Sequence, residues 1–267
     1  MLIIGEKINA TRKSIDDALK ARDAARIQEV AKAQEQAGAD FLDVNCGTVA
    51  VCEEPEAMQW LVKTVQEASG LPLCIDSPNS EALAAGLRVH AGKPLINSIS
   101  GETVRYRSVL PLVKEYEAGV IALCNDDRGL PSSKIMALEV GDSLVTRLVA
   151  DGVPLSNIYL DPLVRTLATS PETVVESLEV MRELSLRYPG LHFVSGLSNV
   201  SFGLPERRHL NRAFLAMSVA CGLDAVITDP MDAQLVALIY ASEALMNKDR
   251  FCMKYIGAYN QGKLKVQ

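Results

Sequence analysis

Polar side chains follow the short apolar stretches of this 267-residue chain. Asp76, Asn97 and Asp161 each come directly after such a stretch and several residues before the next helix-like segment. Carboxylates and carboxamides accept hydrogen bonds from N–H groups, and a carboxamide also donates to a carbonyl oxygen. Placed together, these side chains would suit a planar heterocycle with an amidine-like N–H edge.

The same arrangement recurs along the whole chain. The polar residues are, in order, Glu6 and Asn9, Asp43 and Asn45, Asp76 and Ser77, Asn97 and Ser98, Asn125 to Asp127, Asp161, Ser198 and Asn199, and Thr228 and Asp229. If the apolar stretches are parallel barrel strands, all these side chains converge on the carboxyl-terminal face, where barrel enzymes keep their active sites. The alternative is that Asp, Asn and Ser only cap the helices that follow, especially within 125–127 and at Asp229.

Eight short runs rich in Val, Ile and Leu are typical of strands buried on both faces of a parallel sheet. They are Leu2–Gly5, Phe41–Val44, Leu71–Ile75, Pro94–Ile96, Val120–Leu123, Ile158–Leu160, Phe193–Ser195 and Ala225–Ile227. Longer segments with helical spacing follow them, at Ala24–Ala37, Pro55–Ser69, Asn79–Val89, Glu102–Ala118, Ser132–Asp151, Pro171–Tyr188, Leu210–Gly222 and Asp232–Asn247. The alternation predicts an α/β fold, a single (β/α)₈ TIM barrel that makes one domain over residues 1–267. An open doubly wound sheet is the alternative, but its Gly-rich first turn is absent.

Composition argues against several classes of partner and site. The net charge is -6 and the 27 Lys and Arg residues are scattered, which disfavours nucleic acid. The apolar runs are too short to span a membrane, and residues 1–7 lack the features of a signal peptide, so we expect a cytoplasmic protein. The three histidines and six cysteines show no metal-ligand spacing, so we predict no metal site, a structural His192 and reduced core cysteines.

Several of these stretches together resemble one family. The strongest is Gly196-Leu197-Ser198-Asn199-Val200-Ser201, followed by Asn211-Arg212-Ala213-Phe214-Leu215. With the segments that carry Glu6, Asp43, Asn45, Asp76, Asn97 and Asp161, the chain from Ile4 to about Ala244 resembles the methyltetrahydrofolate:corrinoid methyltransferases. It is next most similar to the folate domain of cobalamin-dependent methionine synthase, with which it shares Phe202 where stand-alone members often have Gln.

The resemblance implies a pterin-binding barrel and assigns roles to particular residues. Asp76, Asn97 and Asp161 would bind the pyrimidine edge of the pterin, and Asn199 would lie at N5. Gly196 and Ser198 would line the ring and Arg207 would help hold the folate. The expected catalytic residues are Asn199 and Asp161. The remaining expected binding residues are Glu6, Asp43 and Asn45.

The resemblance also implies methyl transfer between N5 of tetrahydrofolate and the cobalt of a corrinoid. The folate is then a substrate, and cobalamin or another corrinoid is methyl donor or acceptor without being stably bound. No Asp-x-His-x-x-Gly motif is present, so the corrinoid would be free or carried by a separate protein. Family members are homodimers, and we expect the same here. A dihydropteroate synthase-like enzyme and a non-catalytic folate-binding protein are the alternatives.

Overall fold

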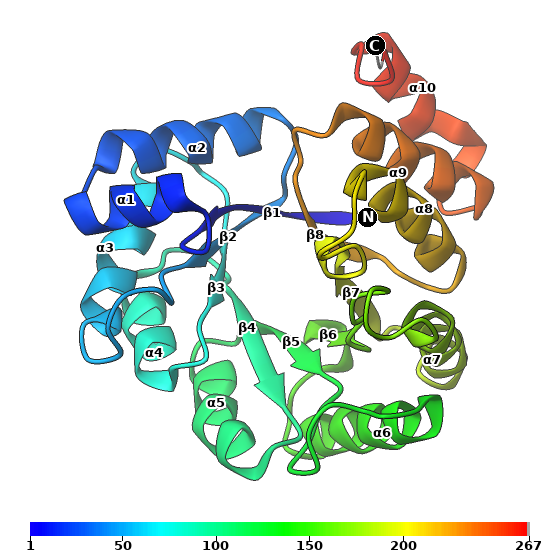
Figure 1. Ribbon diagram of the computed structural model, residues 1–267, viewed down its shortest axis with the longest axis horizontal. Helices are drawn as coiled ribbons and strands as arrows, with labels where there is room; N and C mark the ends of the chain where they lie inside the picture. Colours follow the sequence, from blue (N-terminus) through cyan, green and yellow to red (C-terminus); the bar gives the residue numbers. More distant parts are fainter. Residues whose placement is uncertain (266–267) are drawn as a thin grey trace.

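Eight parallel strands close into a barrel surrounded by helices (Figure 1). The computed structural model describes residues 1–265, so Val266 and Gln267 of the predicted domain lie outside the described part. The strands are β1 (Leu2–Asn9), β2 (Phe41–Asn45), β3 (Leu73–Asp76), β4 (Leu95–Ser100), β5 (Gly119–Leu123), β6 (Ile158–Asp161), β7 (His192–Gly196) and β8 (Ala225–Thr228). They pair in chain order, and β8 returns to β1. The predicted (β/α)₈ barrel is confirmed and the open sheet is excluded.

Helices cover the outside of the barrel (Figure 1). They are α1 (Lys13–Ala21), α2 (Ala24–Gln36), α3 (Glu54–Gln66), α4 (Ser80–Val89), α5 (Thr103–Glu115), α6 (Lys134–Ala150), α7 (Thr173–Arg187), α8 (Arg207–Ala220), α9 (Ala233–Leu245) and α10 (Met253–Asn260). Helices α1 and α10 were not predicted from the sequence. Helix α1 forms because Ile15, Ala18 and Leu19 lie on one face of the helix, and this face is buried. No helix within residues 1–265 is both long and apolar enough to cross a membrane.

The barrel interior changes from apolar to polar toward the carboxyl ends of the strands. Successive strand residues point alternately to the helices and to the interior. An apolar cluster fills the interior with Ile4, Cys74, Leu95, Ile121, Val194 and Ala225. Two residues beyond Cys74 and Leu95, the same interior face carries Asp76 and Asn97. The polar side chains therefore lie directly above this apolar cluster, which is called the apolar floor below.

Two further predictions concern histidine and cysteine. His192 bonds Asp224 through Nδ1 at 2.7 Å and stacks on Tyr159, which confirms a structural role. All six cysteines are free thiols, in agreement with the predicted reduced state. The prediction of core positions is wrong for Cys52 and Cys252, which are exposed because Cys52 lies in a turn and Cys252 in a short 3₁₀ segment, and neither is in a strand.

Candidate active site

A cavity of about 520 Å³, here called the mouth cavity, opens at the carboxyl ends of the strands. Asp76 reaches it from the end of β3, Asn97 from β4 and Asp161 from the end of β6. Gly196, which ends β7, and Asn199, in the turn that follows, also line the wall. Five of the predicted site residues, distant in sequence, therefore share one cavity.

Asp161 offers a buried carboxylate to the mouth cavity. Its Oδ1 accepts a hydrogen bond from the backbone N–H of Leu163 at 2.8 Å, and the Gly196 N–H also faces the carboxylate. Burial raises the pKa of Asp161 to about 6, while these two N–H groups act in the opposite direction. At neutral pH Asp161 is therefore ionised and can accept further N–H groups from a ligand.

Asp76 is a second buried carboxylate, held by a neighbouring carboxamide. Its Oδ2 accepts a hydrogen bond from Asn45 Nδ2 at 2.9 Å. Burial raises the pKa of Asp76 to about 6, and the Asn45 hydrogen bond and the charge of Arg105 partly offset the rise. Asn45 does not itself line the mouth cavity. It orients Asp76, so the predicted contact between Asn45 and the folate stays a prediction.

The raised pKa of Asp76 predicts how stability depends on pH. The folded chain binds a proton at Asp76 more readily than the unfolded chain does, so the free energy of unfolding should rise as pH falls from 7 toward 4. Asp76→Asn removes the buried charge and keeps an oxygen for Asn45. We expect it to stabilise the ligand-free chain by about 2 kcal/mol at pH 7 and to flatten this pH dependence.

Urea denaturation at pH 5 and pH 7 measures both effects. Asp17→Asn, at an exposed position of α1, is the control and should leave the pH dependence as it is in the wild type. A destabilised Asp76→Asn chain at pH 7 would contradict the assignment of a buried charge.

The turn that carries Asn199 is anchored by its own apolar residues. Leu197 and Val200 are buried, which fixes the short 3₁₀ segment η2 (Leu197–Asn199) against the barrel. A Cβ atom on Gly196 would lie 3.1 Å from Asn199 Nδ2. Glycine at this position therefore leaves room for the Asn199 amide beside the strand end.

Hydrogen bonds from polar side chains outside the mouth cavity hold the same turn in place. Arg207 donates to Ser198 O at 2.6 Å and to Ser201 Oγ at 3.1 Å. Ser198 Oγ donates to Glu6 Oε2 at 3.2 Å, and Arg12 pairs with the same carboxylate. Burial raises the pKa of Glu6, and Arg12 opposes the rise. Ser198, Glu6 and Arg207 do not line the mouth cavity, so their predicted contacts with folate stay predictions.

Asp43 also lies outside the wall of the mouth cavity. Its side chain is 2% exposed and points into the barrel interior, beside Cys74 of the apolar floor. A direct contact between Asp43 and a ligand would need the floor to open. The predicted contact between Asp43 and the folate therefore stays a prediction.

Arg105 of α5 is a lining residue that the sequence analysis did not select. Its guanidinium donates to the carbonyl oxygens of Ser77, Pro78 and Ser98, at 2.8, 2.6 and 2.8 Å. It thereby ties the loops after β3 and β4 together beside Asp76. The sequence gives little signal for this role, because Arg105 comes from the first turn of a helix and not from a strand end.

The alternative that these residues cap the helices that follow them is wrong for Asp127 and Asp229, because Ser133 caps α6 and Asp232 caps α9. Asp127 accepts a hydrogen bond from the backbone N–H of Thr103, the first residue of α5, at 3.0 Å. Asp229 accepts from the N–H of Met231 at 3.0 Å and pairs with Lys7. Asn125, in contrast, lines the mouth cavity.

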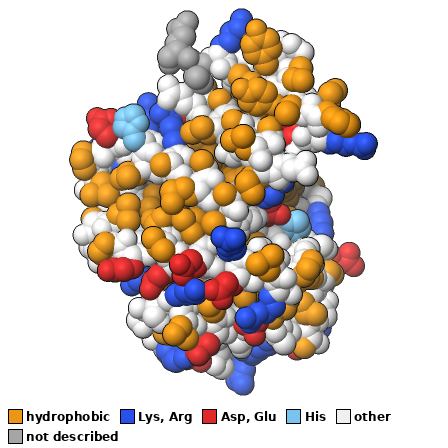
Figure 2. All heavy atoms as spheres, turned by 90° about the vertical axis from the view of Figure 1, so that its right-hand side faces the viewer, with side chains coloured by type: hydrophobic (Ala, Val, Ile, Leu, Met, Phe, Trp, Pro, Cys, Tyr) orange, Lys and Arg blue, Asp and Glu red, His pale blue; other side chains and the backbone are white. Residues whose placement is uncertain are grey.

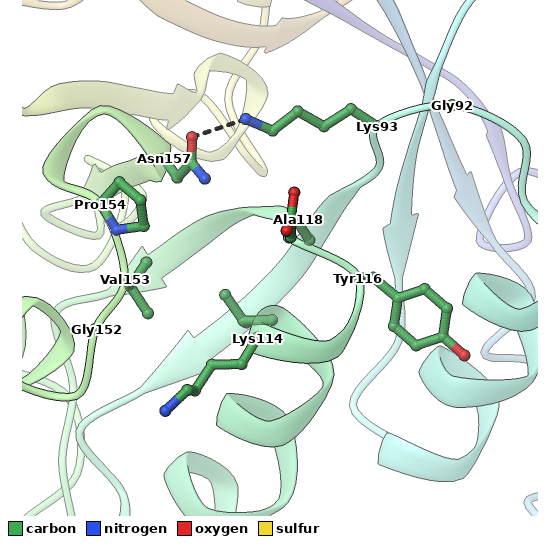
Figure 3. A pocket seen from close by; sticks show the side chains of 11 residues that line it. Gly92, Lys93, Lys114, Tyr116, Ala118, Gly152, Val153, Pro154 and Asn157 are labelled. Carbon is green, nitrogen blue, oxygen red and sulfur yellow. Dashed lines mark hydrogen bonds between the residues drawn. The ribbon is translucent and has the colours of Figure 1, made fainter.

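A second hollow, of about 730 Å³, lies at the opposite end of the barrel, between the loops that precede β4, β5 and β6 (Figure 3). Lys93 Nζ donates to Asn157 Oδ1 there at 2.8 Å. Its lining holds one carboxylate, Glu117, and one carboxamide, Asn157, against the two aspartates and three asparagines of the mouth cavity. Since barrel enzymes react at the carboxyl-terminal face, we place the active site in the mouth cavity. No cluster of His, Cys, Asp and Glu within residues 1–265 could hold a metal ion.

The chain is similar to known proteins over most of its length. The model of the family described as "Pterin binding enzyme" matches residues 5–229. The methylcorrinoid:tetrahydrofolate methyltransferase of Eubacterium limosum is 36% identical over 269 residues, which cover 99% of this chain and 98% of that protein. The methionine synthase of Mycobacterium tuberculosis is 33% identical over 240 residues, which cover 85% of this chain but only 20% of that longer protein.

Solved structures share the fold at low sequence identity. A dihydropteroate synthase from Xanthomonas albilineans, in complex with 7,8-dihydropteroate, has a TM-score of 0.67 at 16% identity, covering 92% of each chain. The dihydropteroate synthase of Yersinia pestis has a TM-score of 0.68 at 17% identity, covering 92% of this chain and 93% of that one. At this identity the likeness establishes the barrel alone.

Proposed function

Because the chain belongs to the family of pterin binding enzymes, we propose that it moves a methyl group between N5 of tetrahydrofolate and the cobalt of a corrinoid. The observation that carries the proposal is the convergence of Asp76, Asn97, Asp161 and Asn199 on one cavity at the mouth of the barrel. The similarity to a methylcorrinoid:tetrahydrofolate methyltransferase over nearly the whole of both chains supports this reaction.

We propose that the two buried carboxylates hold the pterin by its N–H edge. Asp76 and Asp161 are ionised at neutral pH, and each has a second oxygen or lone pair for a ligand. Hydrogen bonds to a buried charge are stronger than neutral ones, because little water competes for the carboxylate. The Asn97 amide adds one further polar contact to the ring. These three residues therefore fix the orientation of the pterin.

The chemical difficulty lies at N5. An amine anion is a poor leaving group, so N5 must gain a proton or a strong hydrogen bond as its bond to the methyl carbon breaks. We propose that Asn199 rotates its amide toward N5 and stabilises the charge that changes there, without transferring a proton itself. Asp161 would polarise the pterin or orient a water molecule.

The methyl group passes between two substrates. In one direction Co(I) of the corrinoid attacks the N5-methyl carbon, and the electron pair of the C–N bond remains on N5, which takes up a proton. In the other direction N5 attacks the methyl carbon of methyl-Co(III), the electron pair of the Co–C bond remains on cobalt to give Co(I), and the N5 proton is released. The chain's part is to hold the pterin and stabilise N5, and the same residues serve both directions. The corrinoid would come free or on a separate protein.

A dihydropteroate synthase reaction receives less support from the cavity. A pyrophosphate needs free cations, and Arg105 is the cation that lines the mouth cavity. Its guanidinium is already bonded to three carbonyl oxygens. Lys7 is paired with Asp229.

The proposed function is tested by following the cobalt spectrum without oxygen. Methyltetrahydrofolate is mixed with Co(I) cobalamin in one cuvette, and tetrahydrofolate with methylcobalamin in another. We expect the chain to accelerate both conversions. Binding of methyltetrahydrofolate without any change at cobalt would instead identify a non-catalytic folate-binding protein.

We also propose a homodimer that forms through the outer face of α8, α9 and α10. Hydrophobic side chains gather on the side of the molecule that carries these helices (Figure 2). Leu245 at the end of α9 is 86% exposed and Phe251 is 78% exposed, and Met217, Met253 and Ile256 are also exposed. Exposed apolar surface of this extent marks interaction sites in soluble proteins. An apolar face is self-complementary, as a twofold interface requires.

Sedimentation velocity at micromolar concentration tests the dimer. We expect a dimer for the wild type and mostly monomer for Leu245→Asp, because the substitution buries a charge at the interface. Ile135→Asp, at an exposed apolar position of α6, is the control and should stay dimeric. A monomeric wild type would contradict the proposal.

The cysteines and the net charge bear on the cellular context. Six free cysteines suit the reducing cytoplasm, where we propose that the chain works as one pterin-binding domain. A net charge of -6 disfavours nucleic acid and anionic membrane surfaces as partners.

A further inference from the structure

Asn125 lines the mouth cavity from the loop after β5, and the reaction proposed above gives it no part. Along β5, Ile121 belongs to the apolar floor and Leu123 lines the cavity, so Asn125 comes next toward the opening. Leu123 lies opposite Asp161, the last residue of β6. Asn125 therefore lies nearer the opening than the Asp161 carboxylate, as does Asn199 in the turn after β7.

The backbone of Asn125 is held on both sides. Its N–H donates to Leu123 O at 2.8 Å, and its carbonyl oxygen accepts from the N–H of Gly101, in the loop after β4, at 2.8 Å. A Cβ atom on Gly101 would lie 2.9 Å from this oxygen, too close for a side chain, so the glycine permits the contact. These contacts fix the place of the Asn125 side chain on the cavity wall.

The two polar groups of the Asn125 amide have different surroundings. Oδ1 is buried and has no hydrogen-bond partner among residues 1–265. The NH₂ group has no partner among these residues either, but it is open to solvent at the cavity wall. A buried acceptor without a partner lowers the free energy of unfolding. The fold therefore gains nothing from this amide, whereas a ligand in the cavity could accept a hydrogen bond from it.

Several other donors of the cavity wall are already bonded. The Arg105 guanidinium donates to three carbonyl oxygens, and the hydroxyls of Ser77 and Ser100 donate to glutamate side chains. The buried aspartates can only accept while they are ionised. A pterin carries a ring carbonyl oxygen beside its N–H edge, and this oxygen needs a donor. The NH₂ group of Asn125 can supply one.

We infer that the Asn125 NH₂ group donates a hydrogen bond to the ring carbonyl oxygen of the pterin. This oxygen lies between the N–H edge, which the carboxylates would hold, and N5, at which Asn199 would act. The inference rests on the proposed function, because it concerns how that site recognises its substrate. Asn125 is then a specificity-determining residue. It disfavours a diamino analogue, in which an NH₂ group replaces the ring carbonyl oxygen and two donors face each other.

Asn125→Leu removes the donor and keeps the approximate size of the side chain. We expect it to bind methyltetrahydrofolate about tenfold more weakly, the loss that one neutral hydrogen bond carries, with the methyl-transfer rate at saturating folate nearly unchanged. Its affinity for the diamino analogue of methyltetrahydrofolate should change less than about threefold, because the wild type makes no such bond to that ligand. Unchanged affinity for methyltetrahydrofolate, or equal losses for both ligands, would overturn the inference.

Asn125→Asp keeps the shape of the side chain and replaces the donor by an acceptor. It should bind methyltetrahydrofolate at least about tenfold more weakly, because a carboxylate would then face the carbonyl oxygen. Wild-type affinity in this variant would show that Asn125 accepts and does not donate, which would overturn the inference. Asn9→Leu is the control, since Asn9 bonds Thr11 and does not line the mouth cavity. It should bind both ligands as the wild type does.

Stability separates a ligand contact from a structural role. The urea midpoint of Asn125→Leu should equal or exceed that of the wild type, because the substitution removes a buried acceptor that lacks a partner. A lower midpoint together with equal losses for both ligands would mean that Asn125 supports the fold, and the inference would fall. If Asn125→Leu does not fold, the affinity of Asn125→Asp decides.

Calorimetry on the full chain measures these affinities. If the wild type does not bind methyltetrahydrofolate, the inference and the proposed function both fall. If the wild type binds it and the two ligands respond alike to Asn125→Leu, the inference alone falls.

Discussion

Asn199→Ala is expected to lower the rate of methyl transfer about 100- to 1,000-fold, with less than about a fivefold change in the affinity for methyltetrahydrofolate. A donor that acts on charge developing in the transition state contributes little to binding the ground state, and losing one such donor costs about this much in rate. The Asn199 amide lines the mouth cavity on a turn anchored by two buried side chains. Single-turnover kinetics gives the rate, and calorimetry gives the affinity.

The matched control for this prediction is Asn9→Ala. Asn9 also ends a strand at the same rim, but it bonds Thr11 and does not line the mouth cavity. We expect the control to keep both rate and affinity near those of the wild type. Equal losses of rate and affinity in Asn199→Ala would instead make Asn199 a simple binding residue.

Asp161→Asn is expected to weaken folate binding about 100-fold at pH 7. The substitution replaces one carboxylate oxygen by an NH₂ group. This NH₂ group must face either the N–H edge of the pterin or the backbone N–H groups of Leu163 and Gly196. In both cases two donors face each other and one N–H is left without an acceptor. The wild-type affinity should also fall as pH is lowered through about 6, because protonation of Asp161 and Asp76 removes acceptors.

Isothermal titration of methyltetrahydrofolate from pH 5 to pH 8 measures both effects. Asp127→Asn is the control, since Asp127 bonds Thr103 at the rim and does not line the mouth cavity. It should bind folate as the wild type does. Wild-type affinity that is constant across this range would show that the two carboxylates do not accept hydrogen bonds from the ligand.

The fold was predictable because its strands are short and apolar on both faces. Val120–Leu123 and Ala225–Ile227 show this pattern and fall within β5 and β8. The pattern for α1 was harder to recognise, because this helix stands between β1 and α2 and breaks the simple alternation of strand and helix. For α10, most of the apolar residues are exposed, so burial on the barrel does not explain its composition.

The site was predictable where a polar residue directly follows a short apolar run and faces the barrel interior. Asp76, Asn97 and Asp161 meet this condition, and all three line the mouth cavity. The sequence does not distinguish the residues that line the cavity from those that hold them in place by hydrogen bonds, because these hydrogen bonds join different strands and loops. Asn45, which holds Asp76, and Arg105, which ties two loops together, both show this.

The most direct test of the account follows the methyl carbon itself. Methyltetrahydrofolate labelled with ¹³C in its N5-methyl group is incubated anaerobically with Co(I) cobalamin and the chain, and the carbon is observed by NMR. We predict that its resonance moves from the N5-methyl position to the cobalt-methyl position with the wild type, and far more slowly with Asn199→Ala. A label that stays on N5 with the wild-type chain, while the folate is bound, would contradict the account.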